Sequence, residues 1–111
     1  MTPDQFRVLA LSFPEAVESS HQGHADFRVG GRVFASLGFP DADHGAVMLS
    51  PEDQSYFLAA HGEAFSPAKG AWGKAGSTVV RLVKAERQAA EAALEAAWRR
   101  RAPKRLLSDL S

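Results

Sequence analysis

Hydrophobic residues recur along the chain with periods that predict helices at both ends and strands between them. An apolar stripe of helical period follows a capping-box pattern at Thr2 and Gln5 and ends before Pro14. A capping serine followed by proline and two acids predicts a second helix over residues 50–60. Residues 85–101 are rich in alanine and predict the longest helix.

The strongest strand pattern covers residues 27–39, where two alternating segments flank Gly30 and Gly31. Adjacent glycines accept the positive φ angles of a tight hairpin turn, so the two segments are predicted to pair. On the second segment, strict alternation places one set of side chains on one face, Val33, Ala35, Leu37 and Phe39, and another set on the opposite face, Phe34, Ser36 and Gly38.

Two further strands are predicted, over residues 46–49 and 78–83, from their alternating valine and leucine residues. Residues 15–25 are polar and predict irregular structure, and residues 65–76 predict a short strand followed by a loop. Gly62 is available as a left-handed cap at the end of the second helix.

The predicted order is α-β-β-β-α-(β)-β-α. Hairpin-connected strands with separate helices indicate a two-layer α+β domain, in which helices cover one face of an antiparallel sheet. The chain has no internal repeat and no linker, so residues 1–111 are predicted to form a single domain.

The composition favours a folded protein with one core, since 45% of residues are hydrophobic and 23% are charged. No apolar run approaches the length that crosses a bilayer, and the N-terminus lacks a signal pattern. The chain has no cysteine, which excludes disulfides, thiol catalysis and thiolate metal sites. These features predict a cytoplasmic protein without a membrane partner.

Charge is distributed unevenly along a chain whose formal net charge is zero. Residues 1–63 hold nine acids and three bases, for a net charge of −6, whereas residues 64–111 hold ten bases and four acids, for +6. Such a division predicts either a basic surface or two halves whose charges complement each other in the folded state.

Several groups of residues, spread over most of the chain, have the character of family motifs. They are Ser20-His21-Gln22-Gly23-His24-Ala25-Asp26-Phe27-Arg28, Val29-Gly30-Gly31-Arg32-Val33-Phe34-Ala35, Phe65-Ser66-Pro67, Gly70-Ala71-Trp72-Gly73, Ala97-Trp98-Arg99 and Ala102-Pro103-Lys104-Arg105-Leu106. With these motifs the chain resembles the MmcQ/YjbR family of small bacterial proteins. In that family a lysine usually stands at the position of Arg32, and the two cations are not equivalent.

The resemblance implies a two-layer fold similar to type III secretion chaperones. It also implies a binding role, because DNA binding has been proposed for some members of the family. The predicted nucleic-acid site consists of basic residues in the C-terminal part of the chain, Lys74, Arg99, Arg100, Arg101, Lys104 and Arg105. Two observations argue against DNA binding. The isoelectric point is near 6.9, and the helix dipole alone explains cations at the end of a helix.

The alternative function is a small-molecule or protein-binding module that uses a pocket or the open face of the sheet near Trp72 and Arg28. The other side chains predicted for that site are His24, Arg32 and Phe34. The buried stripe of the last long helix is predicted to be Ala90, Leu94, Ala97 and Trp98, so Trp98 is predicted to lie in the core.

The side chains of His21, His24 and Asp26 are suitable metal ligands, so these residues form a candidate metal site. The competing interpretation is that they form hydrogen bonds within a loop, and we predict no metal and no cofactor. Residues 70–78 resemble a phosphate loop only faintly, because Ala75 follows the lysine and a strand follows the loop. No nucleophile–base pair is recognisable, so no catalytic residue is predicted and binding is favoured over catalysis.

Overall fold

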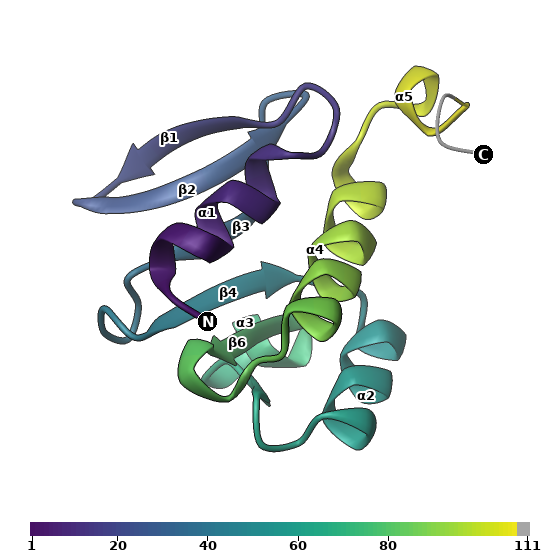
Figure 1. Cartoon of the computed structure of the whole chain (residues 1–111). Coiled ribbons are helices and arrows are strands. Elements are labelled where there is room, and N and C mark those ends of the chain that lie inside the picture. Colours follow the sequence, from purple (N-terminus) through teal and green to yellow (C-terminus); the bar gives the residue numbers. More distant parts are fainter. Residues whose placement is uncertain (109–111) are drawn as a thin grey trace.

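The computed structural model describes residues 1–108, and the elements are labelled in Figure 1. Their order and bounds are α1 (Pro3–Leu11), β1 (Val17–His21), β2 (His24–Val29), β3 (Arg32–Leu37), β4 (His44–Met48), α2 (Pro51–Ala60), β5 (Phe65–Pro67), α3 (Gly70–Lys74), β6 (Ser77–Arg81), a 3-10 turn (Leu82–Lys84), α4 (Arg87–Arg101) and α5 (Lys104–Ser108).

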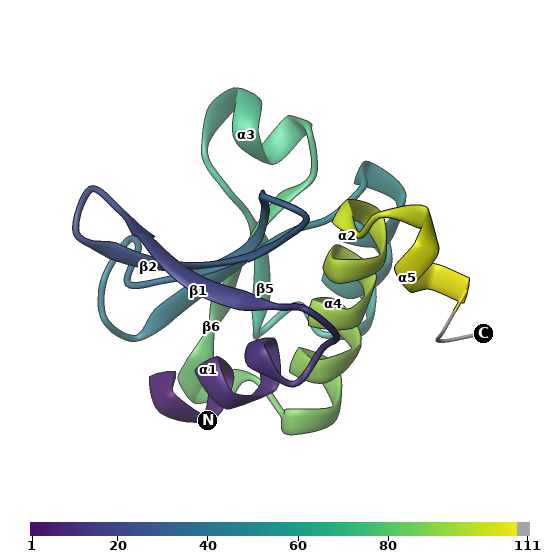
Figure 2. The same cartoon turned by 90° about the horizontal axis from the view of Figure 1, so that it is seen from above.

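All strand pairs in the sheet are antiparallel, and the strand order is β1-β2-β3-β4-β6-β5. Helix α4 packs on β3 and β4, and α1 packs beside α4 on the same two strands. Figure 2 shows α1 and α4 on one side of the sheet and α3 projecting on the other side. The predicted α+β architecture, an antiparallel sheet with helices on one face, is therefore confirmed.

The diglycine turn forms as predicted. Gly30 has φ +58° and Gly31 has φ +78°, so both adopt the left-handed conformation that lets β3 return antiparallel to β2. Gly30 also lies against the connection between α4 and α5, because a Cβ atom at this position would come within 3.0 Å of Pro103 Cγ. The turn is thus held beside the end of α4.

Strict alternation along β3 is wrong at one position. Val33 pairs with Arg28 and Ala35 pairs with Phe27, which leaves Phe34 unopposed in a β-bulge. The extra residue shifts the side chains, so Phe34 and Ala35 are both fully buried and Val33 is only partly buried. Phe34 therefore belongs to the core and not to the open face.

Residues 15–25 contain a second hairpin instead of irregular structure. Strand β1 pairs with β2 from Val17 opposite Arg28 to His21 opposite His24. The turn uses Gln22 at φ +52° and Gly23 at φ +81°. Every residue of β1 is exposed, so the alternation of hydrophobic and polar residues that predicts strands is missing from this edge strand.

The helices follow the sequence closely. Thr2 and Gln5 form the capping box at α1, and Ser50 accepts a hydrogen bond from the backbone N–H of Asp53 at α2. Two predictions are wrong. Gly62 does not form a left-handed cap, because α2 ends at His61, which has φ −141°. Residues 70–74 form the short helix α3 and not a loop. Strand β6 ends at Arg81, before the 3-10 turn.

The core lies between the sheet and the two helices that cover it. Trp98 is fully buried, as predicted, and its indole Nε1–H donates to the carbonyl of Pro14 at 3.0 Å. Its ring stacks on Phe13 with 6.1 Å between ring centroids. The predicted buried stripe of α4 is confirmed in full: Ala90, Leu94, Ala97 and Trp98. Among the described residues, no helix combines the length and apolar character needed to cross a membrane.

Candidate binding surfaces

The basic end of α4 and α5 contains five of the six residues predicted to bind nucleic acid, and two of these already have carboxylate partners. Arg99 Nε donates to Glu95 at 3.1 Å. Arg105 donates to both carboxylate oxygens of Glu15, at 2.7 and 2.8 Å. These hydrogen bonds lower the pKa of Glu15 below its usual value, and the charge of Arg105 adds to the effect. Both arginines are therefore less available to an external anion.

Three other arginines form a group that we call the arginine cluster: Arg32, Arg100 and Arg101. None of the three forms an ion pair with a carboxylate in the described part of the chain. Burial lowers the pKa of Arg101, and the charges of Arg100 and Arg32 lower it further, so both of these arginines lie close enough to Arg101 to disfavour its charged form. The structure thus brings Arg32 of β3 to the end of α4.

The register of the hairpin explains how Arg32 reaches that place. Arg32 pairs with Val29, which is fully buried under the helices, and cross-strand partners point to the same face of a sheet. Arg32 therefore emerges on the helix-covered side, next to the connection at Pro103 that touches the diglycine turn. The sequence places Arg32 about seventy residues from Arg101, and no local pattern relates them.

Lys74, the sixth residue of the predicted nucleic-acid site, ends α3. Figures 1 and 2 show α3 well apart from α5, on the side of the sheet that α1 and α4 leave open. Lys104 is exposed at the start of α5, beside the arginine cluster in sequence. The structure therefore separates Lys74 from the arginine cluster, and Lys104 is related to the cluster by its place in the sequence.

The predicted ligand-binding residues are not brought together into one site. Phe34 is buried in the core, and Arg32 lies on the helix-covered side. The side chain of Arg28 is on the opposite face of the sheet from that of its neighbour Val29. Its guanidinium group donates to both carboxylate oxygens of Asp26, at 2.9 and 3.1 Å. This hydrogen-bonded pair raises the pKa of Arg28. Trp72 lies on α3 and is 74% exposed.

The face of the sheet that α1 and α4 leave open has a central row of short side chains that crosses all the strands in register. Its members are Ser19, Asp26, Ser36, Ala46, Val79 and Ser66. Asp26 is 4% exposed and is the only buried acid among the described residues. Sequence reasoning missed this row because its members belong to six different strands and share no pattern along the chain.

Three of the four histidines, His21, His24 and His44, lie at the ends of strands, and His61 ends α2. His21 pairs with His24 across the first hairpin, and the ring of His24 packs edge-on against Phe39 at 6.1 Å between ring centroids. His44 forms a hydrogen bond with Asp41 at 2.7 Å, which lowers the pKa of that carboxyl group. Within residues 1–108 there is no group of three metal-ligating side chains.

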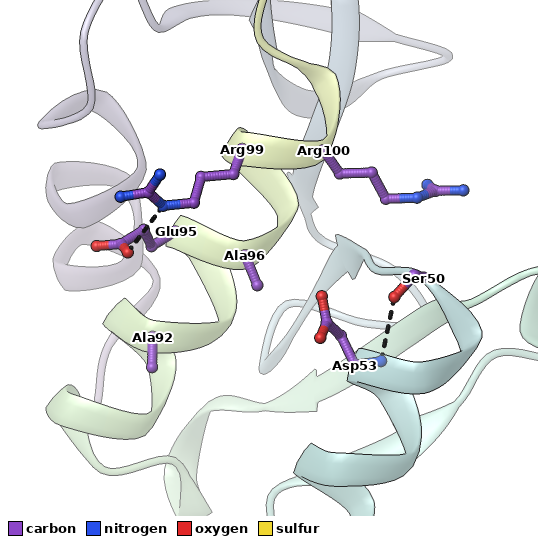
Figure 3. Close-up of a pocket in the computed structure, with 7 residues that line it drawn as sticks. All are labelled: Ser50, Asp53, Ala92, Glu95, Ala96, Arg99 and Arg100. Atoms are coloured by element: carbon purple, nitrogen blue, oxygen red, sulfur yellow. Dashed lines mark hydrogen bonds and ion pairs between the residues drawn. The ribbon is translucent and has the colours of Figure 1, made fainter. Parts of the chain in front are cut away.

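A hollow of about 480 Å³ lies between the start of α2 and the last turns of α4 (Figure 3). Ala92 and Ala96 line its apolar side, and Ser50 and Asp53 line the opposite side. Figure 3 shows that Arg99 turns back to Glu95 while Arg100 extends the other way, past Ser50. Arg100 thus lies on the boundary between this hollow and the arginine cluster.

Comparison with known proteins agrees with the resemblance noted in the sequence. The family model described as YjbR matches residues 11–100. The crystal structure of Deinococcus radiodurans protein DR2400, with a DUF419 domain, superposes with a TM-score of 0.75 at 17% sequence identity. That alignment covers 98% of this chain and 87% of the other, and at this identity it establishes the fold alone. No curated protein sequence matches the chain significantly.

Proposed function

We propose, from the premise that this chain belongs to the YjbR family, that the protein is a binding protein and not an enzyme, and that its ligand is DNA. The arginine cluster carries this proposal. Three guanidinium groups gather at the end of α4 without carboxylate partners among residues 1–108, and Lys104 follows them in sequence. Such a surface attracts the phosphate backbone of a duplex.

A cluster of this kind favours contact with phosphates over reading of bases. Arginine presents a planar fork of N–H donors that matches a phosphate group, and neutralising a phosphate releases condensed counterions. The carboxylate partners of Arg99 and Arg105 reduce the contribution of those residues. We therefore assign the backbone contacts to Arg32, Arg100, Arg101 and Lys104.

Titration of a short labelled duplex at increasing salt tests the proposal. With three to four phosphate contacts, affinity is expected to fall about 40-fold to 150-fold between about 50 and 200 mM salt. The double variant Arg100→Gln with Arg101→Gln is expected to weaken binding and flatten that dependence. Arg99→Gln is the matched control, because Arg99 is already paired with Glu95, and it should change affinity little. Absence of binding at about 50 mM salt would contradict the proposal.

A second candidate is a small-molecule or protein-binding role for the open face of the sheet. It is favoured by two large exposed aromatic side chains, Trp72 at 74% exposure and Phe39 at 65%. Exposed aromatic residues are enriched where proteins bind partners. Arg28, fixed by Asp26, supplies a positioned cation on the same face.

An NMR titration with small aromatic compounds tests the open face as a binding surface. It follows the indole N–H signals of Trp72 and Trp98. Binding at the open face is expected to shift the signal of Trp72 and the backbone amides around Arg28. The signal of Trp98 is the internal control, because that indole is buried and bonded to Pro14. If compounds bind and the Trp72 signal does not move, the open face is not the binding surface.

A further inference from the structure

We propose that Arg32, Arg100 and Arg101 form a discrete binding site for one phosphate oxyanion, in which the buried Nε–H of Arg101 is the central donor. The inference deepens the proposed function and rests on the same cluster, but it also holds for free phosphate or a small phosphorylated molecule. The shared chemistry is a tetrahedral oxyanion held by guanidinium groups.

Arg101 has a buried donor without a partner among the described residues. Its Nε atom is buried and has no hydrogen-bond partner in the described part of the chain. No other side-chain nitrogen or oxygen in residues 1–108 is both buried and without a partner. Buried donors are nearly always paired in proteins, and leaving one unpaired destabilises the fold. A phosphate oxygen is an acceptor that would satisfy this donor.

The charge around that donor is positive. Arg101 is flanked by Arg100 on α4 and faces Arg32 on β3, and both neighbours disfavour its charged form. Like charges are normally dispersed or compensated, because bringing them together raises the electrostatic energy. In this protein nine of the thirteen acidic residues lie in the first 63 residues, yet none of those described pairs with the cluster. An anion bound at the cluster would remove this repulsion.

The backbone around the arginine cluster is held by contacts on both sides. The diglycine turn that carries Arg32 packs against Pro103, directly after the last turn of α4. On the far side, Arg105 on α5 is tied to Glu15, and Trp98 is bonded to Pro14. These contacts fix the backbone on both sides of the cluster, so the elements that carry the three arginines are in place before an anion arrives.

Phosphate binding can be measured on the full chain by calorimetry with sodium phosphate, using sodium chloride at matched ionic strength as the reference. The wild-type protein is expected to bind one phosphate. Arg32→Gln and Arg101→Gln are each expected to weaken binding about tenfold or more, since each removes charged hydrogen bonds. Arg99→Gln is the matched control on the same helix turn and should leave phosphate binding unchanged.

Arg101→Lys separates a shaped site from general attraction of anions. Lysine keeps the positive charge but removes the Nε–H donor and the guanidinium plane. Phosphate binding is therefore expected to weaken about as much as in Arg101→Gln. If Arg101→Lys binds phosphate as tightly as the wild type, or if phosphate binds no better than chloride, the proposal is overturned. Denaturation curves of each variant confirm that it is folded.

The DNA titration identifies the source of the phosphate. If phosphate binds at the cluster and duplex DNA does not, the site stands and its ligand is a small phosphorylated molecule, so the DNA-binding function fails alone. If DNA binds with a steep salt dependence but phosphate binding is unaffected by Arg32→Gln and Arg101→Lys, the discrete site fails and the DNA-binding function stands.

Discussion

Replacing Trp98 with alanine is expected to lower the free energy of unfolding by about 3–5 kcal/mol, which is much of the about 5–15 kcal/mol typical of a small domain. Trp98 is fully buried at the C-terminal part of α4, so its removal leaves a large cavity. The variant also leaves the carbonyl of Pro14 without its donor at 3.0 Å and removes the stacking with Phe13.

Urea denaturation followed by far-ultraviolet circular dichroism measures this loss. Trp72→Ala is the matched control, since it makes the same chemical change at a position that is 74% exposed, and it is expected to change stability by no more than about 0.5 kcal/mol. Similar losses in the two variants would show that Trp98 does not carry the packing assigned to it. Because Trp98 holds the segment that leads to Glu15, its loss should also loosen the ion pair with Arg105.

The helices and the central hairpin could be predicted because their signals are local. A capping box at Thr2, a capping serine at Ser50 and the alanine-rich stripe of α4 each act over a few neighbouring residues. The diglycine requires positive φ angles wherever it lies in the chain, so its turn could also be recognised. The α+β class follows from these elements, whereas the family was indicated by the sequence motifs.

The misplaced elements depend on contacts between distant segments. Strand β1 has no apolar alternation, because it is an edge strand with every residue exposed, and it exists through its pairing with β2. The bulge at Phe34 interrupts the regular alternation of β3 and allows the ring of Phe34 to be buried in the core. Helix α3 is only five residues long, too short for a periodic signal.

The arginine cluster was predicted only in part, because it too depends on contacts between distant segments. Consecutive arginines at the end of α4 are visible in the sequence, and their position as a basic helix end was expected. The sequence did not show which of these arginines have a carboxylate partner among residues 1–108, because the partner of Arg105 is Glu15, ninety residues away. Arg32 was expected near Trp72, yet the register of the hairpin directs it to Arg101 instead.

Replacing Gly76 with alanine is expected to lower the free energy of unfolding by about 2–5 kcal/mol, from about 1–2 kcal/mol of backbone strain and about 1–3 kcal/mol of crowding. Gly76 has φ +116°, and an added Cβ atom would lie on the carbonyl group of Leu49, which belongs to the buried chain between β4 and α2. That carbonyl is backbone and cannot move without shifting the start of α2.

Gly70→Ala is the matched control for this effect, because Gly70 has φ +65° and a Cβ atom there would meet nothing within 4 Å. It therefore carries the backbone strain without the crowding, and its expected loss is only about 1–2 kcal/mol. Urea denaturation of the two variants measures the difference. Equal losses would mean that Leu49 and the start of α2 yield to the added methyl group.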